Sequence, residues 1–224
     1  MAQLEIAELT KIYTVGNQSI TAVNSVSLNI EKGEFVSIVG HSGSGKTTLL
    51  SIIGGIMKPT SGRVVFEGQD ISALNDDSLS EYRNEKIGFM FQFASLLPML
   101  TVRENVLLPG LFRQKRSGGD EKKAEEFLNL VDIGEKVDAY PSQLSGGQQR
   151  RVAIARALMY GPQVILADEP TGDLDEETEA DIMGLFRRLN REEQMTFIFI
   201  THNLDLAKMA QRQLRMTHGV LAGI

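Results

Sequence analysis

Short apolar runs, typical of strands, alternate with stretches of helical spacing along most of this chain of 224 residues. Near the N-terminus, Leu4–Ile6 and Thr21–Ile30 show partial period-two alternation, and the turn-like pair Gly16-Asn17 lies between them. Phe35–Val39 is a continuous apolar run that predicts a buried strand. The pattern then predicts three more elements: a helix at Thr47–Ile53 and strands at Arg63–Glu67 and Ile87–Phe91.

The spacing becomes helical between Phe93 and Met159. Thr101 and Glu104 have the separation of a capping box, which predicts a helix beginning there. Glu121–Val131 places its apolar residues at helical intervals. This stretch predicts a helical lobe inserted into a mixed α/β core.

Strand–helix alternation resumes after the helical stretch, and it favours a mostly parallel sheet with helices on its faces. The predicted elements are strands at Val164–Ala167 and Thr196–Ile200 and helices at Glu176–Asn190 and Leu204–Ala210. We expect an α/β fold with an N-terminal antiparallel β subdomain and an inserted helical subdomain. Residues 1–224 are predicted to form a single domain, with a core of residues 1–92 and 160–224 and a helical subdomain at about residues 93–159.

Composition narrows the classes of function. Asp and Glu outnumber Lys and Arg 29 to 23, the formal net charge is -6, and no dense basic block occurs, so we expect no nucleic-acid partner. The absence of cysteine excludes disulfides and thiolate metal sites. No apolar run approaches the roughly 20 residues of a membrane-spanning helix, and Met1–Glu5 lacks the features of a secretory signal. Any role at a membrane is expected to come through a partner.

A glycine-rich loop, Gly40–Thr47 (GHSGSGKT), joins the predicted strand to the following helix. It matches the pattern G-x-x-x-x-G-K-[ST], in which successive N–H groups point at phosphate oxygens and the helix N-terminus adds positive charge. Lys46 is expected to reach the β- and γ-phosphates, and the Thr47 hydroxyl to bind Mg²⁺. His41 is most simply a solvent-facing loop residue. The candidate nucleotide-binding residues here are Gly40, His41, Ser42, Gly43, Ser44, Gly45, Lys46, Thr47 and Thr48.

Two acids, Asp168 and Glu169, directly follow the apolar run Val164–Ala167. Ligands of open α/β sheets bind beyond the carboxyl ends of the strands, so these acids and the phosphate loop are expected to open onto the same crevice. Asp168 is expected to hold Mg²⁺, usually through water, and Glu169 to act as the general base toward the attacking water. The alternative is that both acids only cap the following segment.

Thr201-His202 follows the next predicted strand in the same way, so His202 is expected to point toward the γ-phosphate. A single histidine at a strand end is as often structural, and its place in this ordered set favours the catalytic role. His218 has no comparable context and receives no role.

A second anion-binding pattern, Leu144–Gln148 (LSGGQ), precedes the helical run Val152–Met159. A serine and two glycines at a helix start offer N–H groups to an anion. The chain has one phosphate loop, so this second pattern needs a nucleotide held elsewhere.

With these motifs in this order, the chain resembles the ATP-binding subunits of ABC transporters over essentially its whole length, which implies a P-loop NTPase core, ATP and Mg²⁺. The resemblance implies that Tyr13 stacks on adenine and that Gln92 links the γ-phosphate and Mg²⁺ to the helical lobe. Without the resemblance, the favoured interpretation is that Tyr13 is a half-buried core residue and Gln92 a polar group at a strand end. The residues implied to contact the γ-phosphate of the opposite protomer are Ser145, Gly146 and Gly147, with Gln148 completing the signature, and Gly172–Asp175 is implied to cross the dimer interface.

A narrower resemblance is to the lipoprotein-release, macrolide-efflux and cell-division group of these ATPases. Its segments are Phe91–Phe93, Leu96–Pro98, Pro141–Gln143 and Glu169–Gly172. Two positions depart from that group's pattern: Asp173 replaces a common asparagine, and Arg150 replaces a common glutamine.

The resemblance implies a head-to-tail homodimer that sandwiches two MgATP, and an integral membrane ABC subunit docked near Phe93–Leu97. The chain would then be peripheral at the cytoplasmic face of the inner (cell) membrane, and it would drive export, lipoprotein release or force transmission. Alternatives are a soluble ABC-type ATPase that acts on DNA or ribosomes, a module that senses nucleotide without hydrolysing it, and an importer subunit. The first lacks support from a basic stripe, and intact Lys46, Asp168, Glu169 and His202 disfavour the second.

Overall fold

The computed structural model describes residues 2–113, 119–172 and 174–224. Strands from this part of the chain form a six-stranded central sheet. Strand β10 pairs with β9 in antiparallel fashion, and every other pair of neighbouring strands in the sheet is parallel. Its strands in spatial order are β10 (Val220–Gly223), β9 (Arg212–Thr217), β3 (Phe35–Val39), β8 (Thr196–Ile200), β7 (Val164–Asp168) and β6 (Ile87–Met90). The predicted mostly parallel sheet is confirmed.

A second, antiparallel sheet is formed by N-terminal segments, as predicted. Its strands in spatial order are β2 (Gln18–Ile30), β1 (Leu4–Val15), β4 (Ser61–Phe66) and β5 (Gln69–Asp70). Strand β1 is much longer than the predicted Leu4–Ile6, whereas β2 begins only three residues before the predicted Thr21. The register of their pairing shifts between Ile6 and Ile12, and Glu8 and Ser25 have positive φ angles of 47° and 46°. Such irregularities break the period-two alternation from which strand length is predicted.

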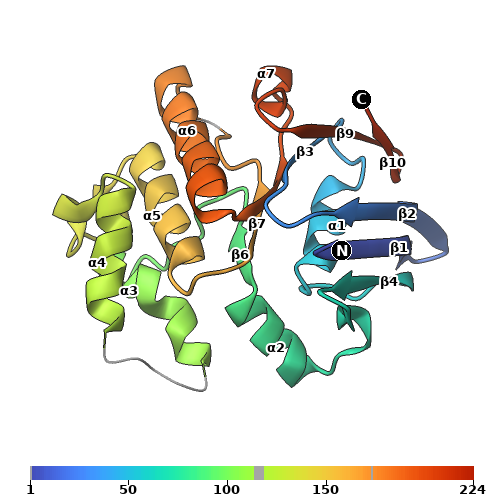
Figure 1. Cartoon of the computed structure of the whole chain (residues 1–224), viewed down its shortest axis with the longest axis horizontal. Coiled ribbons are helices and arrows are strands. Elements are labelled where there is room, and N and C mark those ends of the chain that lie inside the picture. The colour runs from blue at the N-terminus through green and yellow to red at the C-terminus, as the bar shows by residue number, and fades with distance from the viewer. Residues whose placement is uncertain (1, 114–118, 173) are drawn as a thin grey trace.

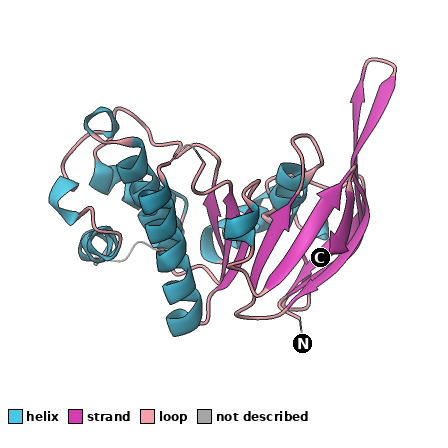
Figure 2. Ribbon diagram, turned by 90° about the horizontal axis from the view of Figure 1, so that it is seen from above, coloured by secondary structure: helices cyan, strands magenta, loops and turns pink. Residues whose placement is uncertain are grey.

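Helices gather at one end of the molecule and strands at the other (Figures 1 and 2). The helices are α1 (Lys46–Ile53), α2 (Asp76–Glu85), α3 (Val102–Leu107), α4 (Asp120–Leu130), α5 (Gly146–Leu158), α6 (Glu176–Glu193) and α7 (Leu204–Ala207). Short 3-10 segments lie at Ile71–Ala73, Leu108–Phe112, Gly134–Lys136 and Pro141–Gln143. Helices α3, α4 and α5 lie together, and all three fall between β6 and β7 in the chain, as expected of an inserted helical lobe. The numerical subdomain boundaries stay a prediction.

Two differences from the predicted helices have physical causes. Helix α2 was not predicted because only Leu79 and Tyr82 are buried in an otherwise polar segment. Its signal is the N-cap, where the Asn75 side chain accepts a hydrogen bond from the Ser78 N–H. Helix α7 ends at Ala207 rather than Ala210, because the chain tightens into i to i−3 turns before it enters β9. The predicted capping box of α3 is confirmed: the Glu104 N–H donates to Thr101 Oγ1 and the Thr101 N–H to Glu104 Oε2.

The central sheet separates two hydrophobic cores. Successive residues of β7 point to opposite faces, so Ile165 and Ala167 pack in the core beneath α5 and α6, whereas Val164 and Leu166 pack in the core beneath α1 and the antiparallel sheet. Both faces are therefore buried, and the polar side chains that follow the strands collect at the carboxyl edge of the sheet. None of the helices in the described ranges is long and apolar enough to cross a bilayer.

Candidate nucleotide site

A cleft of about 300 Å³ opens at the carboxyl ends of the parallel strands. The loop after β3 forms one wall, and residues that follow β6, β7 and β8 form the rest. We refer to this space as the nucleotide cleft. Its lining residues are Ala22, Gly40, Ser42, Gly43, Ser44, Gly45, Lys46, Thr47, Thr48, Gln92, Asp168, Glu169 and His202. The structure thus brings the predicted phosphate loop, both acids, Gln92 and His202 to one place.

At two positions of the loop only glycine fits, because the backbone of another segment passes too close to leave room for a side chain. A Cβ atom at Gly45 would collide with the carbonyl oxygen of Ala22, and one at Gly40 would collide with the carbonyl oxygen of Met216. Gly45 also has a φ of 105°, a conformation that L side chains rarely adopt. It is the N-cap of α1, and no side chain in the described part of the chain caps this helix, so its first N–H groups face the cleft without a side-chain acceptor.

Lys46 is buried, and its ammonium is directed back onto the loop. Lys46 Nζ donates to the carbonyl oxygens of Gly40 at 2.7 Å and His41 at 2.9 Å. Burial lowers the pKa of Lys46, and the nearby carboxylates of Glu169 and Asp168 raise it in part. A phosphate in the cleft would add the negative charge that a buried ammonium favours.

Ser44 supplies a direct test of whether a phosphate fits. Its hydroxyl Oγ is buried and has no hydrogen-bond partner within the residues that the structure describes. A buried hydroxyl without a partner is costly, and a phosphate oxygen in the loop would be an acceptor for it. Together with the uncapped helix and the glycine backbone, the residues present fit a bound phosphate chain.

Asp168 is buried beside Thr47 at the other wall of the cleft. Burial raises the pKa of Asp168, as does the charge of Glu169, whereas a hydrogen bond from the Thr47 side chain and the charge of Lys46 lower it. The described residues contain no group of three or more His, Cys, Asp or Glu that could hold a metal by itself. This donor set fits Mg²⁺, which binds through one or two protein oxygens, substrate phosphates and water.

Glu169 and His202 face each other across the mouth of the cleft. His202 Nδ1 lies 3.4 Å from Glu169 Oε2, with the histidine side chain 71% exposed and the glutamate side chain 23% exposed. Glu169 has a φ of 46°, a strained conformation for a residue with a side chain, and its N–H is held by the Ile200 carbonyl at 3.0 Å. The Ile200 hydrogen bond therefore helps to hold the backbone of Glu169 in this conformation at the end of β7.

Sequence reasoning missed a residue that joins the two loops behind these groups. Glu179, in the first turn of α6, accepts hydrogen bonds from Thr171 Oγ1 at 2.9 Å and from Asn203 Nδ2 at 3.3 Å. Thr171 lies two residues after Glu169, and Asn203 directly follows His202. No sequence signal distinguishes Glu179 from the neighbouring acids Glu176 and Glu177.

Some predicted site residues lie outside the lining of the nucleotide cleft. Tyr13 is half-buried at its edge, where its hydroxyl lies 3.4 Å from Thr48 Oγ1 and 3.1 Å from Met57 Sδ. His41 is exposed, as expected of a loop residue. The predicted interface loop Gly172–Asp175 includes Asp173, which lies outside the described residues.

The signature residues Ser145–Gln148 form the N-terminus of α5 and are also outside this lining. They make a capping box: the Gln148 N–H donates to Ser145 Oγ at 3.2 Å, and the Ser145 N–H donates to Gln148 Oε1 at 2.9 Å. Ser145 and Gly146 are exposed.

Comparison with known proteins agrees with this geometry. Residues 23–172 match the family described as ABC transporter. The chain is 46% identical over 220 residues to the uncharacterized ABC transporter ATP-binding protein MJ0796 of Methanocaldococcus jannaschii, covering 96% of this chain and 94% of that protein. It is 44% identical over 219 residues to the lipoprotein-releasing system ATP-binding protein LolD of Myxococcus xanthus, covering 98% of each chain.

A solved structure gives the same result in three dimensions. The post-hydrolysis state of the ATP-binding cassette MJ0796, a dimer bound to ADP and Pi, superposes with a TM-score of 0.91 at 43% identity, covering 98% of each chain. The predicted α/β fold is thus confirmed as that of an ABC ATPase cassette. The chain belongs to the ABC transporter family, as an ATP-binding cassette that hydrolyses ATP with Mg²⁺.

Proposed function

We propose that this chain is the ATP-hydrolysing subunit of a membrane-embedded ABC complex, and that two copies close around two MgATP and reopen after hydrolysis. One observation carries the proposal: the phosphate loop, Gln92, Asp168, Glu169 and His202 line one cleft, whereas the exposed signature at α5 lies outside its lining. The residues of this cleft can bind a nucleotide within one copy. The signature lies outside the cleft, so it would contact a nucleotide that is bound to a second copy.

Each residue of the cleft has a role that its position supports. Lys46 turns from the loop carbonyls to the β- and γ-phosphates, and the N–H groups of α1 hold the phosphate chain. Thr47, Asp168 and Gln92 would hold Mg²⁺, which would neutralise charge that develops on the transferred phosphoryl group. Tyr13, at the edge of the cleft beside Thr48, stacks on adenine.

Glu169 and His202 act on the reacting groups. Glu169 accepts a proton from the water that attacks the γ-phosphorus, and His202 holds a γ-phosphate oxygen. Their contact at 3.4 Å keeps the base directed across the mouth of the cleft. ADP lacks the γ-phosphate contacts, so hydrolysis favours reopening of the dimer.

Dimer closure supplies the second half of each site. Ser145, Gly146 and Gly147 of one copy contact the γ-phosphate held by the other, and Gln148 caps the same helix. The related cassette MJ0796 was solved as a dimer bound to ADP and Pi, and that arrangement supports a homodimer of this chain.

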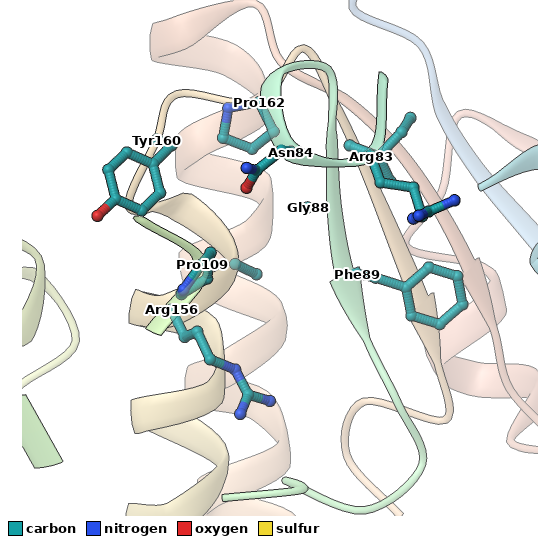
Figure 3. Close-up of a pocket in the computed structure, with 10 residues that line it drawn as sticks. Arg83, Asn84, Gly88, Phe89, Pro109, Arg156, Tyr160 and Pro162 are labelled. Atoms are coloured by element: carbon teal, nitrogen blue, oxygen red, sulfur yellow. The ribbon is translucent and has the colours of Figure 1, made fainter. Parts of the chain in front are cut away.

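An exposed apolar segment supports a membrane partner. Phe91, Phe93 and Leu97 are exposed although large and apolar, and the same is true of Met99 and Phe112. A groove of about 180 Å³ lies nearby between β6 and α5, lined in part by Pro109, Arg156 and Tyr160 (Figure 3). We propose that a cytoplasmic segment of an integral membrane subunit docks here, which makes the chain a peripheral protein at the cytoplasmic face of the cell membrane. The kinship with LolD and with the macrolide export proteins named MacB supports export, lipoprotein release or force transmission.

Glu169→Gln tests the core of this proposal. The variant keeps the shape of the side chain but cannot accept the proton, so we expect ATP hydrolysis to fall by about 10²- to 10⁴-fold while ATP binding persists and a closed dimer accumulates. Phosphate release and light scattering with MgATP measure the two effects. Glu177→Gln, on the exposed side of α6, is the matched control and should hydrolyse and elute like the parent. Hydrolysis at the parent rate by Glu169→Gln would reject the assigned base.

Co-purification tests the partner. We expect an integral membrane ABC subunit to be retained by the tagged chain from detergent extracts. Turnover stimulated by DNA or ribosomes, without such a subunit, would instead favour the soluble ABC-type ATPase.

A further inference from the structure

Arg150 joins three segments that the proposed reaction cycle must move together. It lies in α5, two residues after the signature, and is 6% exposed. Its Nη1 donates to the carbonyl oxygen of Phe91 at 3.0 Å, and its Nη2 donates to that of Gly172 at 3.4 Å. Phe91 is the residue before Gln92, and Gly172 lies three residues after Glu169. One guanidinium thus bridges the loop that senses nucleotide and the loop that carries the base.

A second arginine of α5 fastens the far end of the same segment. Arg156 donates from Nη1 to the Ser95 carbonyl at 2.8 Å and from Nη2 to the Ala94 carbonyl at 2.7 Å. Figure 3 shows its side chain extending from α5 along the groove beside β6. The segment Phe91–Ser95 is therefore tied to α5 at both ends, but only the Arg150 guanidinium, of these two, also reaches the Gly172 loop.

The chemistry of arginine suits this bridge. The guanidinium is planar, always charged, and presents donors in a fixed fork, so it can hold two carbonyl oxygens at a set separation. Hydrogen bonds from a charged donor are shorter and stronger than neutral ones, and a buried guanidinium depends on keeping them. A displacement of one carbonyl is thereby passed to the other and to the helix.

We propose that Arg150 is a positioning residue for ATP hydrolysis, which couples the position of Gln92 to the Gly172 loop behind Glu169 and to the signature end of α5. This inference rests on the proposed function, because it uses the roles given there to Gln92, Glu169 and the signature. Arg150 is not among the residues that line the nucleotide cleft, so we expect its removal to affect turnover and dimer closure rather than the binding of ATP to a single copy.

Arg150→Met tests this role, because methionine fills the space without donating hydrogen bonds. We expect kcat to fall by about 10- to 100-fold, the cost of misplacing catalytic groups by a fraction of an ångström to an ångström, while ATP affinity measured with a fluorescent analogue stays within about 2-fold. In a Glu169→Gln background, Arg150→Met should also reduce the fraction of closed dimer at saturating MgATP. Arg150→Lys keeps charge and a donor and should recover part of kcat.

Arg151→Met is the matched control. Arg151 is the next residue of α5, but it pairs with Asp132 at 3.4 Å and Asp181 at 3.1 Å, away from both loops. Its variant should keep the parent kcat and dimerisation. Equal losses of kcat in both variants would show a general effect on α5 and overturn the proposal, as would an Arg150→Met variant with parent kcat.

Folding and the proposed function are separated by two further measurements. If Arg150→Met melts below the assay temperature, Arg150→Leu, which is shorter and also donates no hydrogen bond, decides the question, and parent kcat in that variant overturns the bridge. If the parent does not hydrolyse ATP or Glu169→Gln accumulates no dimer, the proposed function fails. If the parent hydrolyses ATP, Glu169→Gln accumulates the dimer and Arg150→Met keeps the parent kcat, the proposed function stands and only the role of Arg150 is rejected.

Discussion

Two helix N-termini are proposed to bind the phosphates of ATP, and they differ in whether a side chain caps their first N–H groups. Helix α1 begins at Gly45, without a side-chain cap from the described residues, inside a cleft lined by Lys46, Asp168 and Glu169. Helix α5 begins at Ser145, on the surface, and its own capping box satisfies the N–H of Gln148. A phosphate would therefore supply acceptors that α1 does not receive from its cap, whereas a side chain of the chain itself already accepts from the first turn of α5.

The difference follows from which glycines are needed and why. Gly45 admits the backbone of Ala22, so it shapes the cleft within one copy. Gly146 has open space where its Cβ would lie, and a Cβ at Gly147 would come within 3.0 Å of Thr178 Cγ2. Open space at an exposed helix start is what a close approach from outside requires. This difference supports the proposal that the first region is a complete site within one copy and the second is half of a site shared with another copy.

Lys46→Ala should damage the complete site most. It removes a charge-assisted contact of about 1.5–3 kcal/mol, so we expect ATP affinity of the single copy to fall by about 10- to 100-fold and hydrolysis to be lost. Equilibrium binding of a fluorescent ATP analogue measures the first effect. Lys208→Ala, which removes an exposed ammonium paired with Asp205 on α7, is the control. Unchanged ATP affinity in Lys46→Ala would refute the assignment of the phosphate loop.

Ser145→Ala should damage only the half site. Loss of the N-cap costs about 0.5–2 kcal/mol of stability, and loss of the contact across the dimer should lower hydrolysis by about 10-fold. The ATP affinity of the single copy should not change, because Ser145 lies outside the lining of the nucleotide cleft. Ser142→Ala, at an exposed serine just before the signature, controls for hydroxyl loss. A parallel loss of affinity in Ser145→Ala would erase the distinction between the two helix ends.

The same contrast shows what sequence could predict. Local motifs predicted the phosphate loop, the two acids and His202 at one crevice, because each follows a strand of one parallel sheet. Long-range contacts gave no such signal: the Glu179 bridge joins Thr171 to Asn203 over segments far apart in the chain, and nothing in the spacing of acids in α6 points to it. The predicted length of β1 was wrong for a related reason. Its pairing with β2 is irregular, and this irregularity interrupts the alternation of apolar and polar residues from which strand length is predicted. The catalytic roles of the residues stay predictions that variants must test.

Glu179→Gln should have a smaller effect than either helix-end variant. A glutamine has one acceptor oxygen and an NH2 donor in place of two acceptors, so either the Asn203 amide loses its acceptor or the Thr171 hydroxyl must turn to accept a hydrogen bond. One lost hydrogen bond of about 0.5–1.5 kcal/mol predicts a fall in kcat of about 3- to 10-fold with unchanged ATP affinity. Glu176→Gln, in the same first turn of α6 but exposed, should leave kcat unchanged. A loss of ATP affinity would place Glu179 in binding rather than in support of the two loops.

Asp168→Asn should stabilise the nucleotide-free protein while it abolishes hydrolysis. Burial raises the pKa of Asp168 in the folded state, so the folded protein binds that proton more tightly than the unfolded chain does. Stability from this group therefore falls as pH rises through the raised pKa, and at neutral pH the ionised carboxylate is a net cost. Removing the charge should therefore raise Tm at pH 7 relative to the parent. The gain should shrink as pH falls toward the pKa of an unfolded aspartate, as measured by urea unfolding across that range. If the gain in stability did not depend on pH, the buried charge of Asp168 would not be its source. The nucleotide cleft would then not lower the stability of the protein through this carboxylate.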